Sequence, residues 1–251
     1  MALQIEHLTV NYGERTVLWD ISCSIPPGKL VGVIGPNGSG KSTLLKACAG
    51  VIPIISGKIE IFGRRKNSAR CVYVPQRESV DWNFPISALE LVMMGRYGAL
   101  GPLKWPRSAD KKAALQALED VGMAQFADRQ IGLLSGGQQQ RLFIARALLQ
   151  EGDLYLFDEP FAAVDVTTEK VLIKLFHKLK KQKKSVLVVH HALSTVQEYF
   201  DWALLLNTCL IAAGPVKEVM TAANLKRTYG SAPALMDEAV RLDNKALRGD
   251  I

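Results

Sequence analysis

A glycine-rich stretch near the N-terminus, GPNGSGKS, fits the pattern G-x-x-x-x-G-K-[ST] that binds nucleotide phosphates. It follows the apolar run LVGVI and precedes the helical pattern TLLKACAG, which is the context that this pattern requires. Glycines allow successive backbone N–H groups to turn inward around phosphate oxygens, and the following helix adds its positive N-terminal end. We therefore expect a phosphate cradle formed by Gly35, Pro36, Asn37, Gly38, Ser39, Gly40, Lys41, Ser42 and Thr43.

Two adjacent acids follow a short apolar run in LYLFDEP. An unpaired carboxylate at the end of a buried strand is costly, so Asp158 needs a partner. A nucleotide-bound Mg²⁺ would supply this partner, with the Ser42 hydroxyl as a further ligand, while Lys41 would reach the β- and γ-phosphates. Glu159 would then lie beside the same phosphates, as a candidate general base for an attacking water. The competing interpretation is a purely structural pair of acids.

A second stretch suited to an anion, LSGGQQQR, begins at Leu134 and leads into the apolar-periodic run LFIARALL. The start of a helix binds anions through its free backbone N–H groups. The chain therefore carries two stretches that suit the same ligand chemistry, although a self-contained nucleotide site has no use for the second.

The elements around these stretches follow two different periods. The first third predicts short strands and turns, in LQIEHLTVNY, TVLWDISCSI, KLVGVIG, KIEIFG and ARCVYVP. From about Ile86 the pattern becomes helical, and SADKKAALQALEDVG predicts a helix that is capped by Ser108 and stops at Gly122. The runs LYLF and VLVV are apolar on both faces, which favours a parallel sheet covered by helices. We expect an α/β core, an antiparallel sheet at the N-terminal end and a helical insertion at about 83–145.

The composition is that of a folded chain with a basic surface. The chain has 251 residues, is 48% hydrophobic and carries a formal net charge of +7. This charge would suit nucleic acid, an anionic membrane surface or a nucleotide, although HKLKKQKK is also explained as the solvated face of a helix. WALLLNTCLIAAG is too short to span a membrane and is interrupted by Asn207, and the N-terminus does not resemble a signal peptide. The four cysteines are far apart, which favours reduced, packed thiols.

In this order, GPNGSGKS, VPQ, LSGGQ, LFDEP and VVHH resemble the ATP-binding cassette of ABC transporters, and the resemblance covers nearly the whole chain. It implies a single ABC ATPase domain over 1–251, of the P-loop NTPase (RecA-like) fold, with a mostly parallel sheet, an N-terminal antiparallel β subdomain, a helical insertion and a C-terminal helical extension from about 218. In this family LSGGQ caps the ATP that is held by a second copy in a head-to-tail dimer. The two stretches would then be two half-sites, which answers why one chain carries both.

The resemblance also assigns roles to single residues. The trans signature would be Leu134, Ser135, Gly136, Gly137 and Gln138, with Ser135 and the two glycine amides meeting the γ-phosphate. Tyr12 resembles the residue that stacks on adenine, although core packing explains a lone tyrosine equally well. Gln76 resembles the glutamine that senses Mg²⁺ and the attacking water, and Asp165 the loop that communicates across the dimer. His191, rather than the adjacent His190, resembles the switch histidine, but Ala192 stands where the family has an acid.

The resemblance further implies partners. DWNFPISALELVMMGRYG is where such cassettes bind membrane permease subunits, and Trp82, Phe84 and Tyr97 would form a groove for a permease helix, with an internal core as the alternative. Together with DRQIGLLSGGQQQRLFIARAL and EYFDWALLLN, this stretch resembles bacterial importers of manganese, zinc or iron that are fed by a metal-binding lipoprotein or periplasmic protein.

These implications predict an ATP- and Mg²⁺-dependent ATPase at the cytoplasmic face of the cell membrane, with no nucleic-acid partner. A soluble ABC ATPase acting on nucleic acid or the ribosome is the alternative, although such chains usually carry a long coiled coil or a tandem cassette. A simple P-loop kinase or regulatory module would not need LSGGQ.

Overall fold

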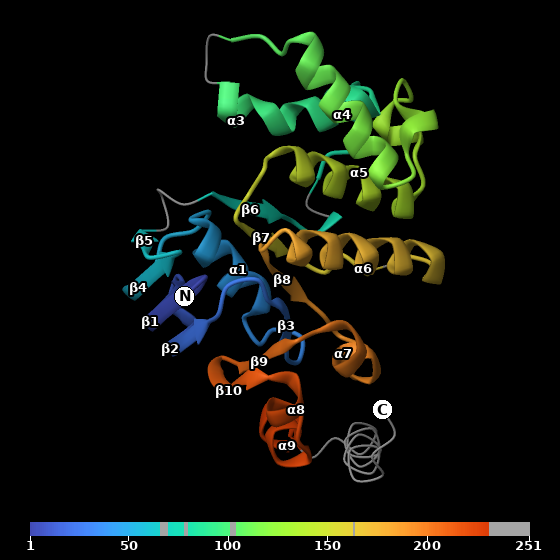
Figure 1. Ribbon diagram of the computed structural model, residues 1–251. Helices are drawn as coiled ribbons and strands as arrows, with labels where there is room; N and C mark the ends of the chain where they lie inside the picture. The colour runs from blue at the N-terminus through green and yellow to red at the C-terminus, as the bar shows by residue number, and fades with distance from the viewer. Residues whose placement is uncertain (66–69, 78–79, 101–103, 163, 231–251) are drawn as a thin grey trace.

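The computed structural model describes residues 1–65, 70–77, 80–100, 104–162 and 164–230. Its N-terminal part is a four-stranded antiparallel sheet in the order β2-β1-β4-β5 (Figure 1). Leu3 and Ile5 alternate with polar residues along β1, a bulge at His7 shifts the register by one residue, and Leu8 and Val10 then face the same interior. The strands are β1 (Leu3–Tyr12), β2 (Arg15–Ile25), β4 (Ser56–Ile61) and β5 (Arg64–Arg65).

A second sheet of six strands forms the centre of the molecule, in the order β10-β9-β3-β8-β7-β6. All neighbouring strands are parallel except β9 and β10, which form an antiparallel hairpin. Every residue of β3, β7 and β8 is buried, as the unbroken apolar runs predicted. The strands are β3 (Leu30–Ile34), β6 (Cys71–Val74), β7 (Leu154–Phe157), β8 (Ser185–Val189), β9 (Trp202–Asn207) and β10 (Cys209–Pro215).

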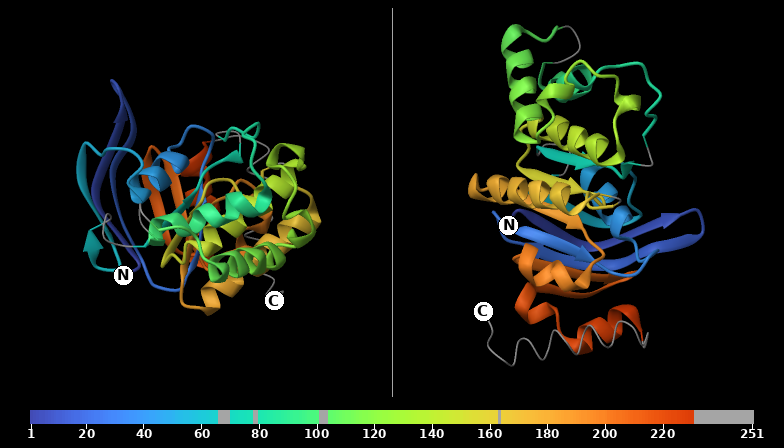
Figure 2. Two further views of the ribbon diagram at one scale, coloured as in Figure 1. Left: turned by 90° about the horizontal axis from the view of Figure 1, so that it is seen from above. Right: turned by 90° about the vertical axis from the view of Figure 1, so that its right-hand side faces the viewer.

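Alternate residues of the central strands belong to two separate hydrophobic cores. Val31 and Val33 of β3 pack with α1 (Lys41–Ala49) and the inner face of the antiparallel sheet. Leu30 and Ile34 of the same strand pack with the helices on the opposite face. The period-2 alternation of a strand thus places α1 between the two sheets, directly behind the cradle (Figures 1 and 2).

The longest helix on the opposite face, α6 (Val166–Lys181), lies along the central sheet. Its buried stripe consists of Leu172, Leu175, Phe176 and Leu179, as the helical period predicted. Lys178 on its outer face is paired with Asp120 at 2.7 Å, so it is bound to a neighbouring helix rather than only solvated.

The chain between β6 and β7 is helical, and its helices gather at one end of the molecule (Figures 1 and 2). The helix predicted from SADKKAALQALEDVG is present, but Ser108 is its first residue and Arg107 is the N-cap, so the predicted cap is wrong by one position. Asp110 decides this boundary, because its side chain accepts a hydrogen bond from the Arg107 N–H at 2.9 Å. The helices are α2 (Ala88–Met93), η3 (Met94–Arg96), α3 (Tyr97–Leu100), α4 (Ser108–Asp120), η4 (Ala124–Phe126), η5 (Ile131–Leu133) and α5 (Gly136–Leu149).

The apolar run WALLLNTCLIAAG, for which no helix or strand was predicted, is the β9–β10 hairpin. Thr208 makes the reversal with a φ of 59°. The remaining helices are α7 (Leu193–Tyr199), α8 (Val216–Val219) and α9 (Ala222–Tyr229), and the last two lie at the end opposite α3 and α4 (Figure 1). The predicted extension is therefore helical as far as Tyr229, and its part LMDEAVRLDNKAL lies outside the described residues. In the described segments, none of the helices has the length and apolar character that crossing a bilayer requires.

Candidate nucleotide-binding site

The glycine-rich cradle lies between β3 and α1, at the carboxyl end of a fully buried central strand. Gly38 and Gly40 have φ values of 79° and 96°, so the backbone there needs residues without a side chain. Lys41 is 5% exposed and its Nζ donates to the carbonyl oxygens of Gly35 and Pro36 at 2.9 and 2.8 Å. Burial lowers the pKa of Lys41, while Glu159 and Asp158 oppose this shift. The ammonium group is thus held inside the cradle that the sequence predicted.

The β9–β10 turn supports the cradle from behind, which the sequence did not reveal. The Thr208 N–H donates to the Ser39 carbonyl at 3.0 Å, and the Trp19 N–H of β2 donates to the Thr208 carbonyl at 2.9 Å. A Cβ atom at Gly35 would lie 2.0 Å from the Leu206 carbonyl oxygen. The cradle is therefore fixed by close backbone contact with a hairpin that is distant in sequence.

This contact makes Gly35→Ala strongly destabilising. The new methyl group meets backbone rather than a movable side chain, so β3 or β9 must shift, at a cost of about 3 kcal/mol. Gly98→Ala is the matched control, because a Cβ atom there meets nothing within 4 Å. Urea unfolding of the two variants measures the difference, and equal midpoints would contradict the assigned contact.

Asp158 lies beside Ser42 at the end of β7, as the sequence predicted for two ligands of one ion. Asp158 is 1% exposed, and it accepts hydrogen bonds from the Ser42 Oγ at 2.7 Å and from the Tyr73 hydroxyl at 3.0 Å. Burial raises the pKa of Asp158, and both hydrogen bonds oppose this shift. A hydroxyl and a buried carboxylate in contact are hard oxygen donors of the kind that Mg²⁺ binds, so the residues fit that ion.

Tyr73 is a member of this cluster that the sequence analysis missed. It lies on β6, the neighbour of β7, and burial followed by the negative charge of Asp158 raises its pKa. Its hydroxyl thus stays protonated and can donate to Asp158. The alternation in CVYV was a signal for this position, because Val72 and Val74 are buried while Tyr73 faces the other way.

Glu159 and His191 lie together, and the Glu159 Oε1 is 2.9 Å from the His191 Nε2. Glu159 has a φ of 54°, a conformation that costs a non-glycine residue about 1 kcal/mol. Strained residues of this kind occur most often at functional sites. The two side chains are partly exposed, at 27% and 42%, so water can reach them.

His190 differs sharply from its neighbour. It is 3% exposed, and its ring lies 5.3 Å from each of the Phe161 and Phe200 rings. The Thr195 hydroxyl donates to the Ala192 carbonyl at 3.1 Å and lies 2.7 Å from the His190 Nε2. Burial lowers the pKa of His190 to about 4, so it is neutral at pH 7. The histidine loop is braced through Thr195 and His190, although Ala192 supplies no acid.

Gln76 and Tyr12 lie at strand ends. Gln76 follows β6, whose Val74 pairs in parallel register with Phe157, so it lies at the same sheet edge as Asp158. Tyr12 is the last residue of β1, pairs with Arg15 and is 50% exposed. The Tyr12 side chain is therefore not part of the hydrophobic core.

The signature residues form a second cluster at the N-terminus of α5. Ser135 is the N-cap, its Oγ accepts from the Gln138 N–H at 3.4 Å, and its own N–H donates to the Gln138 Oε1 at 2.8 Å. Leu134, which precedes this turn, is buried. A Cβ atom at Gly137 would lie 3.8 Å from the Asp165 Oδ2, so Asp165, the N-cap of α6, is a neighbour. Across the described ranges, no hydrogen bond or ion pair joins this cluster to the cradle.

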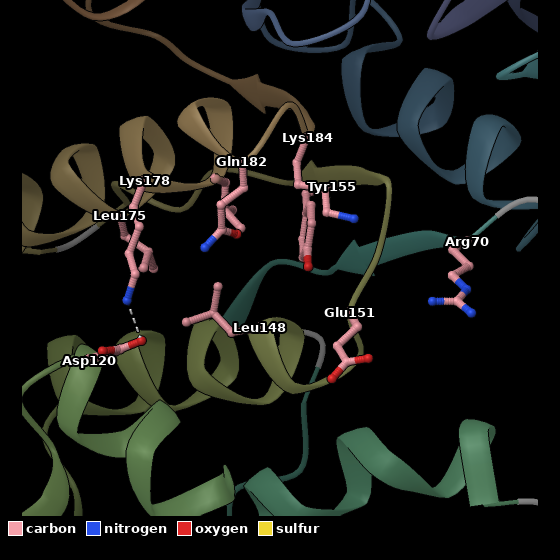
Figure 3. Close-up of a pocket in the computed structure, with 10 residues that line it drawn as sticks. Arg70, Asp120, Leu148, Glu151, Tyr155, Leu175, Lys178, Gln182 and Lys184 are labelled. Carbon is pink, nitrogen blue, oxygen red and sulfur yellow. Dashed lines mark hydrogen bonds and ion pairs between the residues drawn. The ribbon is translucent and has the colours of Figure 1, made fainter.

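A cleft of about 350 Å³ lies at the opposite edge of the central sheet (Figure 3). Its lining includes Arg70, which precedes β6, and Lys184, which precedes β8, while Lys178 and Asp120 form an ion pair at its side (Figure 3). Because the predicted site residues follow the carboxyl ends of the strands, this cleft is a separate feature.

The arrangement can bind a nucleoside triphosphate at the cradle, hold a divalent cation at Ser42 and Asp158, and accept a proton from water at Glu159. It also presents a capped helix start that has no phosphate cradle of its own beside it.

Comparisons with known proteins agree with this geometry. Residues 18–162 match the ABC transporter family. The manganese transport system ATP-binding protein MntB of Bacillus subtilis (strain 168) is 51% identical over 240 residues, which are 95% of this chain and 96% of that protein. The zinc transport system ATP-binding protein TroB of Treponema pallidum (strain Nichols) is 51% identical over 231 residues, which are 91% of this chain and 87% of that protein.

A solved ATP-binding cassette, a dimer in a post-hydrolysis state with ADP and phosphate, superposes with a TM-score of 0.74 at 26% identity and covers 85% of this chain and 98% of that one. The predicted fold, an antiparallel N-terminal sheet beside a mostly parallel sheet with helices, is confirmed. This chain belongs to the ABC transporter family and is an ATP-binding cassette ATPase.

Proposed function

We propose that this chain is the ATP-hydrolysing subunit of a membrane importer for a transition-metal ion. Manganese and zinc are favoured over iron as the cargo. The observation that carries the proposal is the full-length identity of 51% to a manganese-system and a zinc-system ATP-binding protein, together with a cradle and a signature turn that lie apart in one chain. The whole chain would act as one ABC ATPase domain, with the insertion at about 83–145 and the extension from about 218 as parts of it.

In this proposal, ATP lies between the cradle of one chain and the signature turn of a second, identical chain. Lys41 turns from the Gly35 and Pro36 carbonyls to the β- and γ-phosphates. Tyr12 stacks on the adenine from the exposed end of β1. From the second chain, Ser135 and the Gly136 and Gly137 amides meet the γ-phosphate, with Leu134 and Gln138 shaping the turn and Asp165 beside it.

Ser42, Asp158 and Gln76 would hold Mg²⁺, which supplies positive charge against the transferred phosphoryl group. Glu159 accepts the proton of the attacking water, and its contact with His191 allows the histidine to orient both the base and the γ-phosphate. Loss of the γ-phosphate removes contacts to both chains at once and loosens the pair, so hydrolysis can drive a cyclic motion.

Permease subunits supply the path through the membrane, so we place the chain at the cytoplasmic face of the cell membrane. Phe84 and Tyr97, which are 52% and 50% exposed, lie on the insertion and offer apolar surface to a permease helix. Trp82 is instead packed against Phe143 of α5, with ring centroids 5.1 Å apart, so it belongs to the core of the insertion. A metal-binding lipoprotein or periplasmic protein would deliver the cargo to the permease.

The test is co-purification of the tagged chain from detergent-solubilised membranes, followed by manganese and zinc uptake in cells that lack its gene. We expect a permease to co-purify, and we expect the native chain, but not Lys41→Ala, to restore uptake of one of these metals. Nucleic acid or ribosomes in place of a permease, or normal metal uptake without the chain, would contradict the proposal.

A further inference from the structure

Arg77 joins the segment after β6 to the signature turn of the same chain. Its Nη1 donates to the Gln139 Oε1 at 3.4 Å, and Gln139 is a buried residue in the first turns of α5. The Gln139 amide is oriented for this contact, because its Nε2 donates to the Ile131 carbonyl at 3.3 Å. The Arg77 side chain therefore meets an acceptor whose direction is already set.

Gly136 shows how close the guanidinium lies to the signature turn. A Cβ atom at Gly136 would be 2.3 Å from the Arg77 Nη1 and 3.2 Å from its Cζ. The absence of a side chain at Gly136 thus leaves the space that the guanidinium fills. This contact is made by the first residue of α5, immediately after Ser135.

Trp82 joins Arg77 to α5 at a second place. The Trp82 Nε1 donates to the Arg77 carbonyl at 3.0 Å. The Trp82 ring packs edge-on against Phe143 of α5, with centroids 5.1 Å apart. Arg77 therefore contacts Trp82 through its backbone and the start of α5 through its side chain.

We propose that Arg77 is a positioning residue for the signature turn, holding the start of α5 in the orientation that receives the ATP of the other chain. The inference rests on the proposed shared nucleotide site. Arg77 follows Gln76 directly, and Gln76 lies at the cradle edge of its own chain. Gln76 and Ser135 would serve different ATP molecules, so Arg77 is a direct physical link between the two nucleotide sites of one dimer.

The test places the substitution on one side of a single shared site. Both chains are full length and carry Glu159→Gln to stop turnover. One chain also carries Lys41→Ala and offers only a signature turn, while the other carries Ser135→Arg and offers only a cradle. ATP-driven association of this differently labelled pair is measured first with native Arg77 and then with Arg77→Met in either chain.

We expect Arg77→Met in the signature-offering chain to weaken ATP-driven association about tenfold, as loss of a charge-assisted hydrogen bond and its packing implies. In the cradle-offering chain the same substitution should leave association within about twofold, since its signature turn is already disabled. The second arm also controls for folding. Gln139→Leu in the signature-offering chain should reproduce the loss, because it removes the acceptor and keeps Arg77.

A loss of association only in the cradle-offering chain, an equal loss in both chains or no loss in either would overturn the role of Arg77. Failure of the reference pair, with native Arg77, to associate with ATP would instead overturn the shared site and this inference with it. The two failures are distinguishable because only the first requires an Arg77 substitution.

Discussion

Glu159→Gln should bind ATP normally, accumulate as an ATP-bound dimer and hydrolyse ATP at least about 100-fold more slowly than the native chain. Glutamine has the shape of glutamate but does not accept a proton at neutral pH. The glutamine side chain can stay beside His191, and the backbone at position 159 can keep its left-handed conformation. The variant loses only the group that accepts the proton of the attacking water. The hydrolysis rate therefore falls while the affinity for ATP stays the same.

Glu151→Gln is the matched control for this variant. Glu151 has the same φ of 54°, and its carboxylate lies 3.3 Å from the Arg96 Nη1. It follows α5 and precedes β7, so it lies at the amino edge of the sheet, away from the cradle. We expect native turnover in Glu151→Gln, measured by phosphate release. Native turnover in Glu159→Gln would exclude Glu159 as the base.

Ser135→Arg should leave the affinity of a single chain for ATP unchanged and reduce turnover to background. Ser135 lies in the second cluster, which forms no hydrogen bond or ion pair with its own cradle among the residues that the structure describes. The arginine would fill the place where the partner's γ-phosphate must enter. ATP binding at low protein concentration and turnover at high concentration measure the two effects separately.

The same substitution also removes a helix cap, which by itself costs about 1 kcal/mol. Ser87→Arg controls for this loss, since the Ser87 Oγ caps α2 by accepting from the Glu90 N–H at 3.2 Å. We expect Ser87→Arg to keep its turnover. Equal inactivation of both variants would assign the effect to stability, and normal turnover in Ser135→Arg would count against the trans role of LSGGQ.

The cradle and its acids could be predicted from the sequence because each depends on local chemistry. The glycines of GPNGSGKS and the unbroken apolar run before Asp158 are explained by backbone conformation and strand burial alone. Parallel strands then bring their carboxyl ends to one edge, so Ser42 after β3 and Asp158 after β7 lie at the same edge of the sheet.

Contacts between distant segments could not be predicted in this way. The β9–β10 hairpin reads as one apolar stretch until Thr208 reverses it, and only the sheet order places its turn behind the cradle. The pair VVHH gives no sign that His190 is buried among rings while His191 faces Glu159.

The contact of Arg77 with Gly136 could not be predicted for the same reason. The sequence places Arg77 after a predicted strand and Gly136 before a predicted helix, far apart along the chain. Their approach depends on how α5 packs against the end of β6, which is a matter of tertiary packing rather than of local pattern.

The most direct measurement is the ATPase rate per chain as the native protein is diluted with Mg²⁺ and ATP held in excess. A pocket shared by two molecules loses activity per chain once the concentration falls below the dissociation constant of the dimer, in proportion to further dilution. We expect that decline. A rate per chain that stays constant across the dilution series would mean that one molecule encloses and hydrolyses its own ATP.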